Sequence, residues 1–131
     1  MKREFSISVQ FPVAPEVIFR AWLSTKGHAA MTGSPARVTA RVGGKFSAWD
    51  GYITGKTLEL IPSVRIVQAW RTSEFADTDP DSMLEITLRP VKGGTRLTLR
   101  HSGIPEGQAE SYEAGWEESY FTPMRAYFKG L

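Results

Sequence analysis

Residues 104–131 read IPEGQAESYEAGWEESYFTPMRAYFKGL, the longest aromatic-rich segment of the chain. Ring-bearing residues recur in it at spacings of three and four, the repeat of one helix face: Tyr112, Trp116, Tyr120, Pro123 and Tyr127. A second apolar strip, Phe121, Met124 and Phe128, lies beside the first. We therefore predict one long helix over 105–131 that buries a broad aromatic face against another element.

Two residues in this predicted helix are poor helix formers. Gly115 costs about 1 kcal/mol relative to alanine in a helix interior, and Pro123 removes a backbone hydrogen bond at about 3 kcal/mol. One interpretation is a kinked core helix that packs on a sheet. The other is that Gly115 permits close backbone approach while Pro123 bends the helix over the mouth of a cavity.

The composition is that of a single globular domain over residues 1–131, because 41% of the residues are hydrophobic and 23% are charged. The formal net charge of +2 is too small to indicate nucleic acid as a partner. The chain has no cysteine, which excludes disulfides and thiolate metal sites. We see no signal peptide and no apolar run that could span a membrane, so we expect a cytoplasmic protein.

The remaining sequence predicts an α+β fold with a curved antiparallel sheet of about seven strands and two short helices after the first strand. Phe5–Phe11 alternates apolar and polar residues, as a half-buried strand does. Pro15–Leu23 and Ser24–Met31 read as the two short helices. The other strands are separated by turn residues such as Asp50-Gly51, and they are expected at 36–42, 45–50, 52–61, 64–71, 83–89 and 95–102.

No catalytic or metal motif is evident in the sequence, so we expect no catalytic residue, cofactor or metal. His28 and His101 lack partners at metal-ligand spacing. His101 is either a structural histidine beneath the final helix or a polar contact for a ligand. The aspartates of 77–81 do not continue into a calcium loop and fit a solvated, mobile connection better. The dispersed acid–base candidates are Asp50, Glu85, Arg100 and His101, and Glu85 is expected to point away from the main apolar face.

Four tryptophans lie on different predicted elements: Trp22, Trp49, Trp70 and Trp116. Side chains of this size commonly fill a core, but they also line the apolar ligand pockets that form between a helix and a curved sheet. The sequence leaves both interpretations open, since each predicts indoles that face inward.

Several local phrases, in this order, resemble one family. They are VAPEVIFRAW at 13–22, GGKF at 43–46, WDG at 49–51, GK at 55–56, LELIP at 58–62, AWR at 69–71 and GWEE at 115–118. The chain is similar to the START-like (SRPBCC, helix-grip) superfamily, and within it to the homologues of the activator of the heat-shock protein 90 ATPase. The resemblance implies a curved antiparallel sheet that wraps the long C-terminal helix, with an apolar cavity between them.

Three functions follow from this resemblance as alternatives, because the fold does not fix the function. The first is the binding of a small hydrophobic or amphipathic molecule, with an expected site at Trp49, Trp70, Leu97, Leu99, His101, Tyr112, Trp116 and Tyr120. The second is a co-chaperone module that activates the heat-shock protein 90 ATPase. The third is a cyclase- or hydratase-type enzyme that uses the same cavity. We expect a monomer or a weak homodimer.

Overall fold

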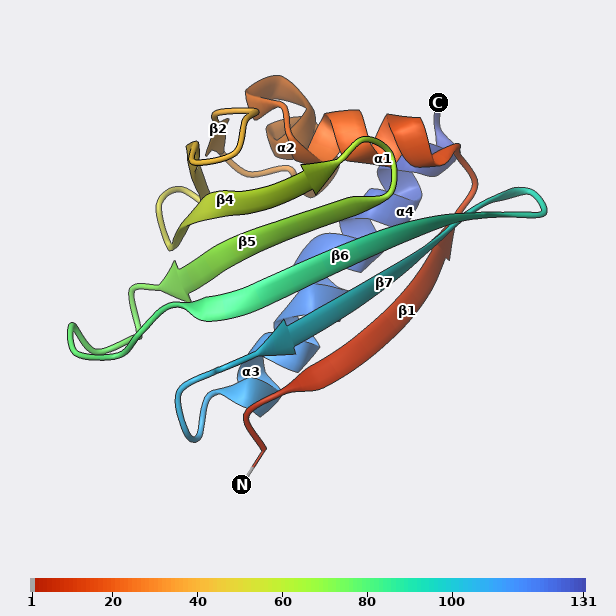
Figure 1. The fold of residues 1–131 in the computed structure, drawn as a ribbon. Coiled ribbons are helices and arrows are strands. Elements are labelled where there is room, and N and C mark those ends of the chain that lie inside the picture. Colours follow the sequence, from red (N-terminus) through yellow and green to blue (C-terminus); the bar gives the residue numbers. More distant parts are fainter. Residues whose placement is uncertain (1) are drawn as a thin grey trace.

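A computed structural model describes residues 2–131, which form one seven-stranded antiparallel sheet with helices on one face. The strand order is β1-β7-β6-β5-β4-β3-β2. The strands are β1 (Phe5–Phe11), β2 (Arg37–Val38), β3 (Lys45–Ala48), β4 (Ile53–Ile61), β5 (Arg65–Thr72), β6 (Ser82–Val91) and β7 (Gly94–Ser102). The predicted fold class, with a curved sheet and two short helices after the first strand, is confirmed (Figure 1).

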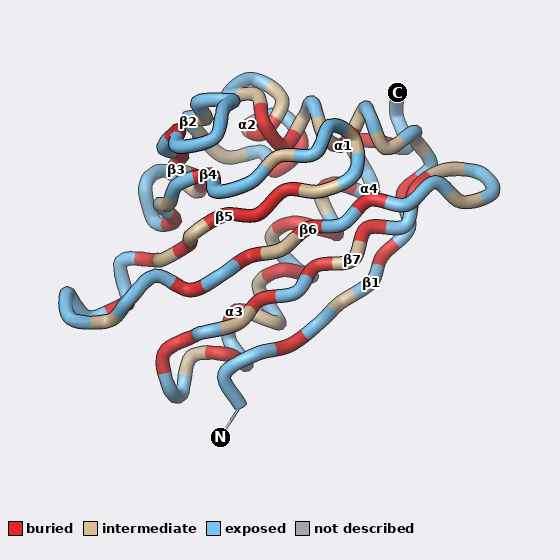
Figure 2. Tube along the Cα trace, viewed as in Figure 1, coloured by how far each residue is buried: buried red, intermediate tan, exposed pale blue. Residues whose placement is uncertain are grey.

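Burial alternates along the strands, as the sequence pattern predicts (Figure 2). In β7, Leu97, Leu99 and His101 are fully buried, while the alternating positions Arg96 and Arg100 are exposed. Because successive side chains of a strand point to opposite faces, these three residues share the inner face with Leu84 of β6. That face forms the floor of the hydrophobic core.

The two short helices, α1 (Pro15–Trp22) and α2 (Thr25–Thr32), form where they were predicted. Pro15 occupies the first turn of α1, and the Ser24 side chain accepts a hydrogen bond from the Gly27 backbone N–H at 2.9 Å. The strand predicted at 36–42 is much shorter. Its ladder ends after Val38 because the loop that follows turns toward β4, where the Gly43 N–H bonds the Thr57 carbonyl at 2.8 Å.

The C-terminal helix crosses the sheet face as three consecutive segments, α3 (Ala109–Gly115), a π-helical turn η1 (Trp116–Phe121) and α4 (Thr122–Lys129). It begins at Ala109 and not at Pro105. Gly107 has a left-handed φ of +85°, which interrupts a right-handed helix, so residues 105–108 form a turn closed by a bond from the Gln108 N–H to the Pro105 carbonyl.

The π-helical turn explains how Pro123 fits inside the helix. The Thr122 N–H bonds the carbonyl of Glu117, five residues back, so the backbone is wider just before Pro123. The wider turn also changes which face is buried. Buried residues follow the spacing of four from Tyr112 to Tyr120 and then continue through Phe121, Met124 and Phe128, whereas Pro123 and Tyr127 are only half-buried. The single continuous aromatic face predicted to Tyr127 is therefore divided at this turn.

Candidate ligand-binding cavity

A cavity of about 270 Å³ lies between the turn that joins β3 to β4, strand β5 and the first half of the C-terminal helix. Its walls are largely aromatic: Trp49, Tyr52, Ile53, Trp70, Tyr112, Gly115, Trp116, Ser119 and Tyr120. None of these described lining residues carries a formal charge. The cavity is therefore an apolar space with a few hydroxyl and indole N–H groups at its walls.

The structure brings five of the eight predicted site residues together at this cavity, namely Trp49, Trp70, Tyr112, Trp116 and Tyr120. Leu97, Leu99 and His101 are fully buried in the core and are not among the lining residues. Sequence analysis missed Tyr52, Ile53 and Ser119. Ser119 follows Gly115 by four residues, so helical spacing alone could have identified it.

Gly115 leaves space at the cavity wall and does not bring two backbones together. A Cβ atom built on Gly115 would meet no other atom within 4 Å. The backbone φ of Gly115 is −62°, an ordinary helical value, so neither conformation nor close contact requires glycine here. The missing side chain enlarges the cavity. Pro123, expected at the cavity mouth, is not a lining residue.

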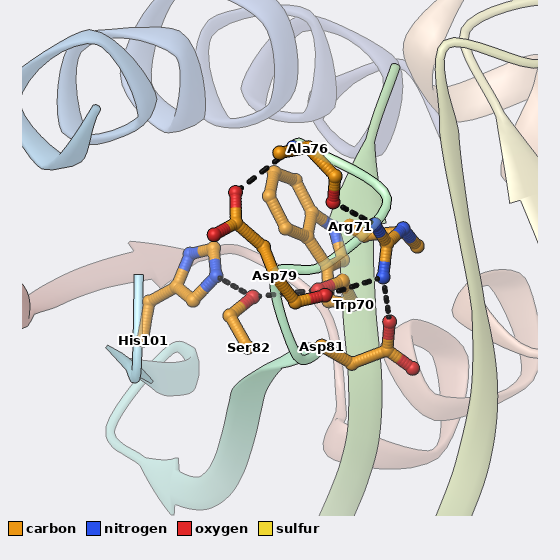
Figure 3. Close-up of polar contacts among 7 residues, drawn as sticks. All are labelled: Trp70, Arg71, Ala76, Asp79, Asp81, Ser82 and His101. Carbon is orange, nitrogen blue, oxygen red and sulfur yellow. Dashed lines mark hydrogen bonds and ion pairs between the residues drawn. The ribbon is translucent and has the colours of Figure 1, made fainter. Parts of the chain in front are cut away.

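Trp116 forms a fixed wall because a chain of buried hydrogen bonds holds its indole. Its Nε1–H donates to His101 Nδ1 at 3.1 Å, and His101 Nε2 lies 2.8 Å from Ser82 Oγ. Since an indole nitrogen only donates, His101 Nδ1 is the acceptor and Nε2 carries the proton. Ser82 Oγ then donates to the Trp70 carbonyl at 2.7 Å. Figure 3 shows the two hydrogen bonds that join His101, Ser82 and Trp70.

His101 is a structural histidine in this arrangement. Burial lowers the pKa of His101 to about 3, so the ring is neutral near pH 7. Its one free lone pair already accepts the Trp116 N–H, and the ring packs at 4.5 Å, centroid to centroid, against Trp70. His101 therefore has no lone pair available to act as a general base.

Tyr120 lines the cavity with its ring and directs its hydroxyl away into the core. The hydroxyl lies 2.7 Å from His28 Nε2, and His28 Nδ1–H donates to the Trp22 carbonyl at 2.9 Å. Burial lowers the pKa of His28 and raises the pKa of Tyr120, so both groups are neutral near pH 7. The Tyr120 hydroxyl therefore donates a hydrogen bond to the unprotonated Nε2 of His28. His28 and Tyr120 are 92 residues apart in the chain, and no local pattern indicates their contact.

The hydroxyl groups of Tyr52 and Tyr112 are engaged by neighbouring residues. Tyr52 donates to the Glu74 carboxylate, and Tyr112 donates to Gln108 Oε1 at 2.5 Å. The Tyr112 oxygen also lies 2.7 Å from Thr72 Oγ1. Burial, reinforced by the bond to Glu74, raises the pKa of Tyr52 to about 12. Both phenols are therefore neutral near pH 7.

Trp49 lines the same cavity, but its backbone is strained and its indole N–H has no hydrogen-bond partner among the described residues. Its backbone φ is +52°, a left-handed value that costs a bulky residue about 1–2 kcal/mol. Asp50 follows at φ +56° and Gly51 at φ +87°, so the Asp50-Gly51 turn predicted from the sequence extends back to Trp49. The Trp49 Nε1 is the one buried side-chain nitrogen or oxygen, within residues 2–131, that has no hydrogen-bond partner.

The predicted acid–base set is not assembled. Arg100 is exposed and bonds Glu85 at 3.1 Å, and neither residue lines the cavity. Asp50 is exposed in its turn and is likewise not a lining residue. None of the four candidates lines the cavity, so these residues form no acid–base pair there.

The aspartate-rich loop between β5 and β6 is held by Arg71. Arg71 donates to the carbonyls of Ala76 and Asp79 at 3.0 and 3.1 Å and to Asp81 at 2.8 Å (Figure 3). The Asp79 carboxylate accepts the Ala76 N–H at 2.8 Å. These groups are used within the loop, and no cluster of three or more metal-ligating side chains occurs in the described part of the chain.

No helix within residues 2–131 is both long and apolar enough to cross a membrane.

A sequence profile of the family described as "Activator of Hsp90 ATPase homolog 1-like protein" matches residues 12–129. Human "Activator of 90 kDa heat shock protein ATPase homolog 1" is 28% identical over 125 residues, which cover 95% of this chain and 37% of that protein. The chain thus spans little more than a third of that relative.

Two solved structures share the fold. An HSP90 activator from Plasmodium falciparum superposes with a TM-score of 0.89 at 29% identity, over 95% of each chain. A protein from Chromobacterium violaceum superposes with a TM-score of 0.79 at 28% identity, over 98% of each chain. These similarities agree with the sheet and helix arrangement described above.

Proposed function

The chain belongs to the family of Activator of Hsp90 ATPase homolog 1-like proteins, and from that premise and the geometry of its cavity we propose that it binds a small hydrophobic or amphipathic molecule between the sheet and the C-terminal helix. The observation that carries the proposal is the uncharged aromatic cavity of about 270 Å³. Pockets of a few hundred Å³ with mostly apolar walls are the usual sites for small ligands.

Gly115 supports the proposal because it lies on the cavity wall at a position where alanine would be better for the helix. Nothing in the backbone conformation requires glycine there, and a Cβ atom would enter open space. The chain therefore keeps a helix-destabilising residue at the cost of about 1 kcal/mol, and the result is a larger cavity.

The test is a two-dimensional ¹H–¹⁵N NMR titration with naphthalene, an apolar probe of matching size. We expect saturable shifts of the cavity residues in the unmodified protein, and at least tenfold weaker binding in Gly115→Leu, whose side chain fills the cavity. Ala114→Leu is the matched control, because Ala114 is exposed on the same helix. Absence of saturable shifts, or equal binding by Gly115→Leu, would contradict the proposal.

A second function is favoured by the relatives. We propose that the domain contacts a heat-shock protein 90 ATPase, since the human and Plasmodium falciparum proteins are both named as activators of that chaperone. The test is the ATPase rate of purified heat-shock protein 90 with and without this chain. A raised rate that persists in Gly115→Leu would indicate contact through a surface outside the cavity, and an unchanged rate would exclude activation by this chain alone.

Location and assembly remain predictions from the sequence. We propose a cytoplasmic protein that is monomeric or weakly dimeric, without nucleic acid as a partner. Cell fractionation and analytical ultracentrifugation test these two properties.

A further inference from the structure

The polar groups around the cavity restrict the charge of any ligand. No lining side chain is charged, so nothing in the wall would neutralise a carboxylate, phosphate or ammonium group. Glu74, the acidic partner of the lining residue Tyr52, already accepts the Tyr52 hydroxyl. An ionic ligand would lose its hydration without compensation. The occupant is therefore a neutral molecule.

The volume of the cavity and its aromatic walls restrict the shape of the ligand. An apolar protein cavity of about 150 Å³ accommodates benzene, and this cavity is about 270 Å³. One or two fused rings fit, whereas a full lipid does not. Trp49 and Tyr52 approach from the sheet side, and Trp116 approaches from the helix. Aromatic walls on two sides favour a flat ring that stacks between them.

The hydrogen-bonding state of the walls restricts the functional group. The Tyr52 and Tyr112 hydroxyls and the Trp116 N–H all have protein acceptors. The Trp49 N–H has none, and a buried donor without a partner typically costs about as much as a lost hydrogen bond. An indole nitrogen can only donate a hydrogen bond. A ligand that satisfies the Trp49 N–H must therefore carry a hydrogen-bond acceptor.

We infer that the cavity takes a neutral, planar molecule of one or two rings with a hydrogen-bond acceptor, such as a carbonyl oxygen or a pyridine-type nitrogen, and that Trp49 donates to it. The inference rests on the proposed ligand-binding function. Trp49 Nε1 is shielded from solvent in the structure. For Trp49 to donate to the ligand, the indole must therefore turn about its side-chain bonds when the ligand binds. Trp49 is suited to this movement because it is only half-buried and no hydrogen bond holds its ring.

The test compares naphthalene with quinoline, which has the same shape but one ring nitrogen that accepts a hydrogen bond. We expect quinoline to bind the unmodified protein about three- to tenfold more tightly, the usual net effect of one added hydrogen bond. Quinoline should also move the Trp49 indole N–H resonance downfield, whereas naphthalene should not. Trp49→Phe identifies that resonance by its loss.

Trp49→Phe is also the matched variant, because it keeps an aromatic ring and removes the donor. The ratio of quinoline affinity to naphthalene affinity should fall to about one in this variant, whatever the change in naphthalene affinity itself. Equal binding of the two probes by the unmodified protein would overturn the inference and leave the proposed function intact. A preference that persists in Trp49→Phe would also overturn it. Binding of neither probe would remove the proposed function and the inference together.

Discussion

Trp116 and Trp49 face the same cavity but are held in opposite ways. Trp116 is 3% exposed, has helical backbone angles, and donates its indole N–H to His101 at 3.1 Å. Trp49 is half-exposed, has a left-handed backbone, and has no partner for its N–H. The helix side of the cavity is thus fixed by tertiary contacts, whereas the β3–β4 side carries local strain.

This difference shows that aromatic lining residues do not all contribute in the same way. Where polar groups are satisfied, as around Trp116, the side chain contributes mainly to stability. Strained residues with unmet hydrogen bonds are more typical of functional positions than of core positions.

The first prediction compares the same truncation on the two sides. Trp116→Ala should lower the free energy of unfolding by about 3–5 kcal/mol, because it opens a core cavity and leaves His101 without its donor. Trp49→Ala should cost only about 1–2 kcal/mol, since that side chain is half-exposed and its unsatisfied N–H is removed with it. Urea unfolding measures both values. Equal losses would show that the two walls are equally fixed.

The second prediction concerns pH. The pKa of His101 is about 3 in the folded protein, compared with an ordinary value of 6.5. Between these values the unfolded chain binds one more proton than the folded chain, so the free energy of unfolding decreases as the pH falls. The expected loss approaches about 1.4 kcal/mol per pH unit below pH 6.5, and His28, whose pKa is also lowered, acts in the same direction.

Urea unfolding between pH 7.5 and 4.5 measures this dependence. His101→Gln is the control, because glutamine cannot titrate but can still accept a hydrogen bond from Trp116. The slope in that variant should be smaller by about 1.4 kcal/mol per pH unit. An unchanged slope would mean that His101 does not remain neutral in the folded protein.

The third prediction concerns the glycine beside Trp116. Gly115→Ala should raise the free energy of unfolding by about 0.5–1 kcal/mol, because the backbone is helical and a Cβ atom meets nothing within 4 Å. Thermal unfolding measures the shift, and Gly107→Ala is the contrasting variant. Gly107 has a φ of +85°, so the same change should destabilise the protein there. A destabilising Gly115→Ala would contradict the assigned open space.

Much of the fold could be predicted because it depends on local patterns. Alternation in Phe5–Phe11 and the residues around Pro15 and Ser24 gave the first strand and the two short helices nearly to the residue. The π-helical turn was not predicted, since π turns are rare and residues 116–121 have an ordinary helical pattern.

The cavity was only partly predictable for the same physical reason. The aromatic residues on the helix and sheet were evident, but the hydrogen bonds that distinguish Trp116 from Trp49 join segments that are distant in the sequence. Trp116 bonds His101 across 15 residues, and the lining residue Tyr120 bonds His28 across 92 residues. A left-handed Trp49 is also unexpected, because residues of this size rarely adopt positive φ.

The π-helical turn has a consequence for how this chain tolerates changes in length. A π turn is geometrically equivalent to one extra residue in an α-helix. Deletion of one residue within 117–119 would therefore restore a regular helix without turning the segment that follows. Met124 and Phe128 would then continue the regular repeat of Tyr112, Trp116 and Tyr120 and stay buried. Relatives of this domain that lack the π turn should therefore be one residue shorter between Trp116 and Phe128.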